Sequence, residues 1–365
     1  MQRWCILDVD RSIRRRCDRR CRGPFLLQCV NREAVSNRVV CRQAFAPIRP
    51  GGFFRAHSAG CGDNLGEPMR TLIALLLLLL RVGPAAAHGG EPHAELDWTI
   101  DPWIVTPILI TAVLHGAGTL RLWQRRKRFS ARLIASVGLF WLGVAVMVIA
   151  LVSPLHELGE HIFTVHMIEH ELVMIVAAPL LALARPVGLL LWGLPKKARH
   201  QVAAAIRHRA ARVAWGVVSL PLVATLLHGL AIWVWHAPTL FDASVTDVLL
   251  HRLQHLSFFL TGLLFWWAIT WRCDYGTAAW HLFVTMIHTG VLGALITLAP
   301  NVIFPDQTRY SDQWGLTPLE DQQMAGLIMW VPGGVIYAAA ALCSVATWIL
   351  SSSQGGKRAD RFHTV

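Results

Sequence analysis

The residues of this sequence best suited to chemistry are histidines spaced four positions apart. His166 and His170 form one such pair, and His251 and His255 form a second pair further along the chain. In an α-helix a residue and the fourth one after it lie on one face, because ~3.6 residues complete a turn. Each pair therefore presents two imidazoles in the same direction, as a metal ion or a cofactor would require.

Other apolar stretches carry further candidate ligands. Met174 lies one turn after His170, on the same face of the expected helix. Imidazole suits copper, zinc, iron and nickel, and an added thioether selects for Cu(I). We therefore expect a copper site holding Cu(I), while a polar network without metal stays open as the structural alternative. The predicted metal ligands are His166, His170, His251, His255, His228, His236, His288 and Met174.

A catalytic role is not expected, although one motif suggests it. The stretch His166–His170 reads H-x-x-E-H, the signature of inverzincin proteases. Such a protease needs an accessible cleft and a third ligand, and the sequence offers no convincing third ligand. We therefore expect no catalytic residues and no enzyme.

The elements that carry these histidines are predicted to be membrane spans. The chain is 54% hydrophobic and only 15% charged, whereas soluble domains are roughly 45–50% apolar and about 25% charged. Seven stretches reach the ~20 apolar residues that a bilayer core demands. We expect an all-α, multi-pass helix bundle over 103–350, with about seven transmembrane helices. The predicted spans are 103–121, 133–153, 162–184, 213–236, 248–271, 279–299 and 323–350.

The charge pattern predicts how these spans are oriented. From residue 88 onward, all basic residues except Arg252 and Arg309 fall in loops or tails on one side. Because cytoplasmic loops carry the excess of Lys and Arg, we expect an N-out, C-in protein of the bacterial inner membrane with a cytoplasmic tail at 351–365. Counted from the outer ends at ~1.5 Å per residue, His170, His228 and His255 all lie at roughly 10–12 Å.

The N-terminal part is expected to be removed or not translated. Residues 69–87 combine a basic start, a short apolar run and an A-x-A motif, as a secretory signal peptide does. The mature chain would then begin with a periplasmic tail at 88–102. Residues 1–68, with thirteen arginines and six of the eight cysteines, are interpreted as a misannotated or disordered extension. Most of the net positive charge, +7 of +12, lies in that extension, so we expect no nucleic-acid partner.

Four blocks of the membrane part carry a family resemblance. They are HMIEH…APLL (166–181), HRLQH…GLLFWW (251–267), HTG…LIT (288–297) and DQQMAGLIMWVPGG (321–334). In these blocks the chain resembles the CtaG-type (caa-type) cytochrome c oxidase assembly factors, over about 95–350. The family pattern often has Gln in place of Glu169 and Glu in place of Gln254, so the carboxylate here stands on the other helix of the pair.

The resemblance implies a role in the respiratory chain. We expect the protein to assist maturation of a haem–copper oxidase by taking copper from periplasmic donors and passing it to the catalytic subunit. Two alternatives stay open. A haem-binding membrane cytochrome would use facing histidines such as His170 with His255, or His115 with His288. A copper or proton transporter would need polar groups continuing to the cytoplasmic face, where only His281 lies.

Overall fold

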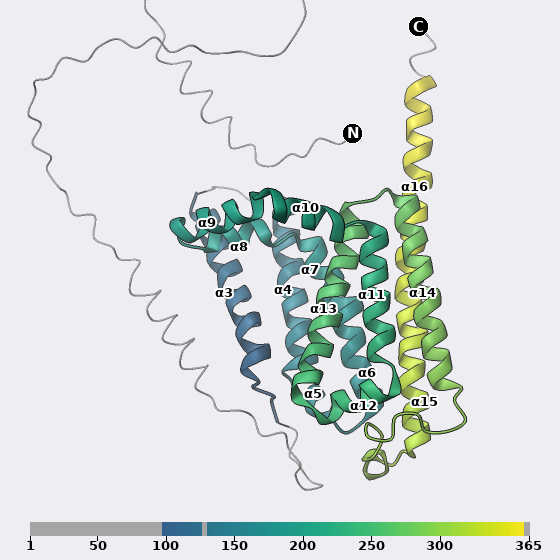
Figure 1. Ribbon diagram of the computed structural model, residues 1–365. Coiled ribbons are helices and arrows are strands. Elements are labelled where there is room, and N and C mark those ends of the chain that lie inside the picture. The colour runs from purple at the N-terminus through teal and green to yellow at the C-terminus, as the bar shows by residue number, and fades with distance from the viewer. Residues whose placement is uncertain (1–96, 126–129, 361–365) are drawn as a thin grey trace, which may run out of the picture. The chain divides into compact units, whose positions relative to one another are not determined.

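The computed structural model describes residues 97–125 and 130–360, and these are helices joined by short connections, without a β-strand. The proposed extension, the signal peptide and most of the N-terminal tail lie outside the described residues. Figure 1 shows the helices as a bundle of roughly parallel spans with shorter helices across both ends. The expected all-α, multi-pass architecture is thus confirmed.

Six helical segments are long and apolar enough to cross a membrane, and a bent helix pair makes a possible seventh. The third is built from α6 (Phe163–Glu171), η1 (Leu172–Ala177) and α7 (Ala178–Ala184), and the last from α15 (Pro318–Ile328), η3 (Met329–Gly333) and α16 (Gly334–Asp360). The others are α3 (Pro102–Arg125), α4 (Ala131–Leu151), α13 (Val248–Trp271) and α14 (Tyr275–Thr297).

The predicted continuous span at 213–236 is wrong in one respect. The chain bends by 69° between α10 (Arg209–Val218) and α11 (Pro221–Trp235). Pro221 is the first residue of α11, where its missing N–H and fixed φ are tolerated, but it cannot continue the preceding helix. The 15 residues of α11 rise only about 22 Å, less than the ~30 Å of a bilayer core.

Two π-helical turns interrupt the third and last spans, and each lies at a proline. The segment η1 ends two residues before Pro179, and η3 contains Pro332. A proline ring clashes with the carbonyl four residues earlier, and a π-turn accommodates this by widening the helix by one residue. Residues after such a turn are rotated relative to an ideal helix.

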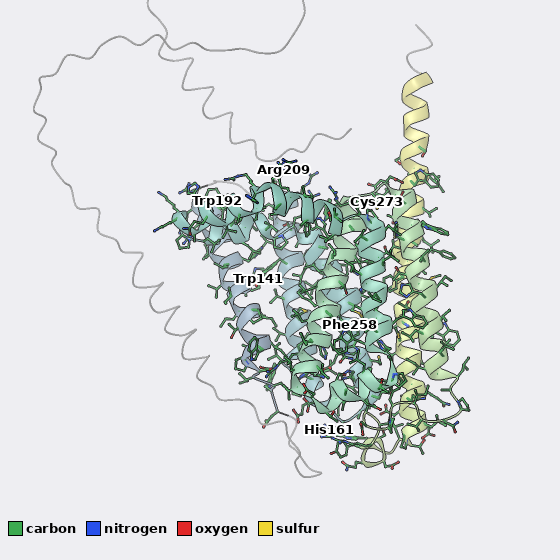
Figure 2. The ribbon with its side chains drawn as sticks, viewed as in Figure 1. Trp141, His161, Trp192, Arg209, Phe258 and Cys273 are labelled. Carbon is green, nitrogen blue, oxygen red and sulfur yellow. The ribbon has the colours of Figure 1, made fainter. Side chains whose placement is uncertain are left out.

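Short helices mark the two ends of the bundle. α5 (Pro154–Gly159) and α12 (Pro238–Thr246) lie at one end, which we call the α5 end. α8 (Val187–Gly193) and α9 (Lys196–Arg207) lie at the other with α10 (Figure 1). Figure 2 places His161 at the α5 end and Arg209 at the opposite one. There the guanidinium of Arg121 donates to the carbonyls of Trp192, Gly193 and Leu194, which end α8.

The third span is the central helix of the bundle. Of its most apolar window 61% is buried, compared with 44% or less for the other candidate spans. Phe163 at its start packs against Phe241 of α12 and Phe304 of the loop before α15. Apolar burial around this helix fixes its rotation, so the side chains of its polar face point inward.

Candidate metal centre

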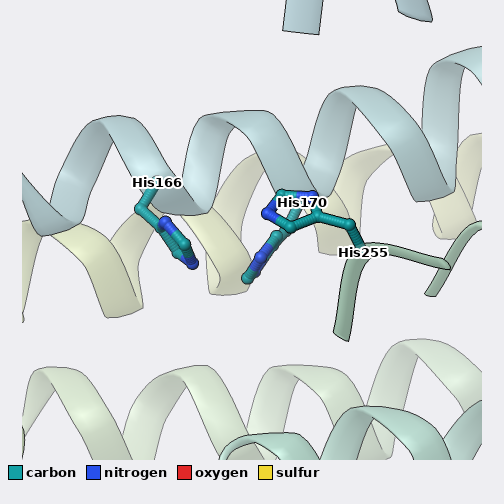
Figure 3. Close-up of side chains that lie close together, drawn as sticks. All are labelled: His166, His170 and His255. Carbon is teal, nitrogen blue, oxygen red and sulfur yellow. The ribbon is translucent and has the colours of Figure 1, made fainter. Parts of the chain in front are cut away.

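Three buried imidazoles from two spans meet near the α5 end. The side chains of His166, His170 and His255 each offer a ring nitrogen, and these nitrogens lie within 4.8 Å of one another. His166 and His170 extend from α6, and His255 reaches them from α13 (Figure 3). Ring centroids are 4.3 Å apart for His166 and His170, and 4.9 Å for His170 and His255. We call these residues the histidine triad.

Three more histidines surround the triad. The ring of His251 lies 4.5 Å from that of His255 and 5.6 Å from that of His166. His156, in α5, lies 5.4 Å from His251. His236, which follows α11, lies 6.2 Å from His170. Together with the triad these residues form the histidine cluster.

Most ring nitrogens of the cluster have no hydrogen-bond partner among the described residues. Both nitrogens of His170 and of His255 lack one, as do the Nε2 atoms of His166, His236 and His251. Buried polar atoms are normally satisfied, because leaving one unpaired costs free energy of roughly 1–3 kcal/mol. Several unpaired nitrogens that converge on one point fit a bound cation, which would satisfy them together. The residues present therefore suit a metal ion.

The start of α6 is positioned by a residue from the far end of the sequence. Asp321 of α15 accepts hydrogen bonds from the backbone N–H groups of Phe163 and Thr164, both at 2.8 Å, and from the hydroxyls of Thr164 and Ser311, both at 2.7 Å. The N-cap residue of α6 itself, Ile162, makes no side-chain capping hydrogen bond. The carboxylate thus caps α6 and fixes the helix that carries His166.

The start of α13 is fixed locally. The side chain of Asp247 accepts hydrogen bonds from the backbone N–H groups of Leu249 and Leu250, as an N-cap residue does. Since α13 begins one turn before His251, its first two turns present His251 and His255 to α6. The buried amide of Gln254 accepts a hydrogen bond from the hydroxyl of Ser244 and does not contact the triad through any recorded bond of the described residues.

His156 was not among the predicted ligands, and it makes the shorter of the two contacts between the cluster and the Glu169 carboxylate, 2.9 Å compared with 3.9 Å for Nδ1 of His166. Nδ1 of His156 lies 2.9 Å from Oε1 of the fully buried Glu169. Burial opposes the charged form, but the Glu169 carboxylate, helped by Glu160 and Glu157, outweighs it and raises the pKa of His156 to about 9. A metal bound at Nε2 would therefore displace a proton. Gly159 permits this contact, since a Cβ there would lie 2.9 Å from Oε2 of Glu169.

The structure brings five of the predicted ligands together: His166, His170, His251, His255 and His236. For the other three, the structure records contacts with residues outside the triad. His228 stacks on Phe265 and contacts the hydroxyl of Tyr337 at 3.3 Å. His288 accepts a hydrogen bond from the indole of Trp233. Met174 belongs to the apolar core, and its carbonyl accepts a hydrogen bond from Trp266.

The expectation for Met174 depended on an uninterrupted α-helix. Met174 lies inside the π-helical segment Leu172–Ala177, and this segment changes the rotation of the chain after His170. The ligand group that the structure brings together consists of three imidazoles, and Met174 as a ligand stays a prediction.

A cavity of about 580 Å³ opens onto the histidine cluster at the α5 end. His156, His166 and His251 line it, whereas His170 and His255 do not. The segment Asp97–Asp101 forms one wall, held by the backbone bond of Thr99 to Val152 and by an ion pair of 2.8 Å between Asp101 and Arg252. The cluster is thus reached from this end of the bundle through its outer histidines.

Comparison with known proteins agrees with this picture of the membrane part. Residues 113–351 match the family model described as cytochrome c oxidase caa3 assembly factor (Caa3_CtaG). Two uncharacterized proteins, from Mycobacterium bovis and Mycobacterium tuberculosis, are each 26% identical over 280 residues. The match covers 72% of this chain but only 41% of either relative, so the chain spans less than half of their length. No solved structure matches.

Proposed function

This chain belongs to the cytochrome c oxidase caa3 assembly factor family, and from that premise we propose that it binds copper at the histidine triad and aids its delivery to the catalytic subunit of a haem–copper oxidase. It acts without catalysing a reaction. Its place is the bacterial inner membrane, with the α5 end facing the periplasm and its copper donors.

One observation carries this proposal: three buried imidazoles offer nitrogens within 4.8 Å of one another, and among the described residues both nitrogens of His170 and His255 and Nε2 of His166 have no hydrogen-bond partner. Imidazole accepts several transition metals, and the choice of copper among them comes from the oxidase that the family serves. A purely structural polar network would pair these nitrogens with each other or with hydroxyls, as His228 and Tyr337 are paired elsewhere in the bundle.

The position of the triad suits transfer rather than storage. His166 lines the cavity and is also a member of the triad, so a metal held by the triad would be bound by one residue that the cavity reaches. Binding sites that pass a metal on need ligands that can be exchanged one at a time, and neutral imidazoles release a cation more readily than thiolates do.

A haem-binding cytochrome is the second candidate, and the packing speaks against it. The rings of His170 and His255 are 4.9 Å apart, and Phe258 lies 4.8 Å from His170. These contacts fill the space that a porphyrin would need between two axial histidines. For the pair of His115 and His288, the ring of His115 stacks on Phe140 at 3.6 Å, and His288 contacts Trp233.

A transporter is the weaker alternative. His281 lies near the opposite end and contacts the hydroxyl of Thr225 at 3.0 Å. In the part of the chain that the structure describes, no recorded hydrogen bond continues from the triad to His281. The three candidate functions therefore keep the order that the sequence suggests: copper-binding assembly factor first, haem-binding cytochrome second and transporter third.

Copper titration of the protein purified from residue 88 onward, the mature form that the sequence predicts, tests the proposal. We expect the protein to retain about one Cu(I) in competition with a chromophoric chelator, and to show no Soret band. Changing His170 and His255 together to Ala should lower the affinity roughly a hundredfold or more, because two of three ligands are lost.

The matched control is His115→Ala, which removes a buried histidine outside the cluster. It should leave the affinity unchanged. In cells, the double variant should reach the membrane while the oxidase loses copper. An oxidase with normal copper content in that strain contradicts the copper role.

A further inference from the structure

The histidine cluster has two layers. His156 and His251 line the cavity, and His170 and His255 lie behind them, out of its reach. His166 belongs to both layers, since it lines the cavity and is also a member of the triad. The outer layer offers two imidazoles at a ring separation of 5.4 Å, and the inner layer offers the triad.

We propose that His156 and His251 form a separate loading site, which takes the metal cation from the cavity before it moves to the histidine triad. This inference rests on the proposed function and deepens it, because it assigns the route by which copper reaches the triad. It also assigns a binding role to His156, a residue outside the two histidine pairs.

The hydrogen bond between His156 and Glu169 makes His156 a better metal ligand. Metal-binding histidines usually donate their second ring N–H to a carboxylate or a carbonyl, which fixes the ring and raises the basicity of the other nitrogen. Nδ1 of His156 makes such a bond to Glu169 at 2.9 Å, and the ring of His156 lies 5.4 Å from that of His251 and 5.8 Å from that of His255. Glu169 is thus a positioning residue for the loading site.

The lining of the cavity favours a cation. Its acidic side chains are Asp97, Asp101, Glu157 and Glu160, and its basic ones are Arg252, Arg309 and His156, which is protonated until a metal displaces the proton. Arg252 is paired with Asp101 in an ion pair of 2.8 Å. A concave surface with an excess of carboxylates raises the local concentration of cations and speeds their arrival.

His166 connects the two sites. Its ring lies 5.6 Å from that of His251 and 4.3 Å from that of His170. A cation held by the outer pair can therefore bind His166 before it leaves His251, and then bind His170 and His255. Transfer by overlapping ligands avoids a step in which the metal is without protein donors in a buried place.

A two-histidine site offers fewer donors than the triad, so the metal rests on the triad at equilibrium. Loss of the loading site should consequently slow the binding of metal without weakening it much. An experiment can therefore distinguish the two sites: loss of the loading site lowers the rate of metal binding, whereas loss of the triad lowers the affinity.

The test is the rate and the equilibrium of Cu(I) transfer from a chromophoric chelator complex to the protein purified from residue 88 onward in detergent. We expect His156→Ala and His251→Ala each to slow loading about tenfold or more, with an equilibrium affinity within about threefold of wild type. His156→Gln, which keeps a polar side chain of similar size, guards against a folding defect and should also load slowly. His161→Ala is the control, since His161 lines the same cavity but contacts Tyr310 and the carbonyl of Glu157.

Variants that load at the wild-type rate overturn the loading site and leave the proposed function standing. Variants that lose affinity as strongly as His170→Ala overturn it too, because they would show one common site. A wild-type protein that binds no Cu(I) overturns the proposed function itself.

Discussion

The histidines of the cluster differ in what holds their rings. Nδ1 of His156 lies against Glu169, and Nδ1 of His236 lies 2.7 Å from the carbonyl oxygen of Ile232. Either bond leaves Nε2 as the donor for a metal. The rings of His170 and His255 have no hydrogen bond that fixes them among the described residues, and packing alone holds them. The fixed rings of His156 and His236 are suited to holding a metal in a defined orientation. The rings of His170 and His255 are suited to binding and releasing it.

Glu169 provides a prediction at the scale of one residue. Glu169→Ala should slow copper loading about tenfold or more, since His156 loses the acceptor that orients it. Glu169→Gln keeps an acceptor oxygen and should recover most of that rate. The measurement is the loading rate of both variants under identical conditions. Equal rates for the Ala and Gln variants would show that the carboxylate position has no orienting role.

At the residue scale, the sequence predicted much of the site but not all of it. The four-residue spacing identified His166, His170, His251 and His255, because helical periodicity determines which residues share a face. Depth along a span does not determine which way a side chain points around the helix. His228 was therefore expected at the level of the triad, but tertiary packing turns it toward Phe265. His156 lies in a short helix between spans, and no second histidine lies four residues away to mark it as one of a pair.

At the scale of the elements, the third span is the one that other elements position. It is capped by Asp321 of the last span, and its own π-turn lies directly after the triad residues. The sequence predicted most span bounds to within a few residues from apolar length. It did not predict the two π-turns or the break before α11, although prolines mark all three places. Whether a proline kinks a helix, widens it or ends it depends on the packing of the neighbours.

Asp321 gives the prediction at this scale. Asp321→Ala should lower the free energy of unfolding by roughly 2–4 kcal/mol, because it uncaps α6 and leaves buried N–H groups unpaired. The control is Glu320→Ala, which removes the neighbouring carboxylate of an exposed capping box with Thr317. That change should cost about 1 kcal/mol or less. Unfolding in increasing denaturing detergent compares the two. A similar loss in both variants would contradict the capping role.

At the scale of the molecule, the structure fixes the bundle but not its direction in the membrane. Described basic residues such as Arg121 and Arg209 lie at the end opposite the α5 end, and the histidine cluster lies at the α5 end. The orientation predicted from charge therefore places the cluster toward the periplasm. The Mycobacterium relatives are more than twice as long as the region that matches this chain.

Chemical labelling tests this orientation. In a variant without native cysteines, Asp312→Cys should react with a membrane-impermeant maleimide in intact spheroplasts, since Asp312 is exposed in the loop before α15. Arg209→Cys, exposed at the opposite end, should react only after the membrane is opened. The reverse pattern would place the histidine cluster on the cytoplasmic side.

The bond between Asp321 and the start of α6 has a consequence for biosynthesis. A ribosome delivers the third span to the membrane long before the last one, so during synthesis α6 waits without its cap. The histidines are made early, but the helix that presents them is completed only when the final span arrives. A chain that is interrupted before that point lacks the carboxylate that caps α6, so the proposed copper site would be incomplete in it.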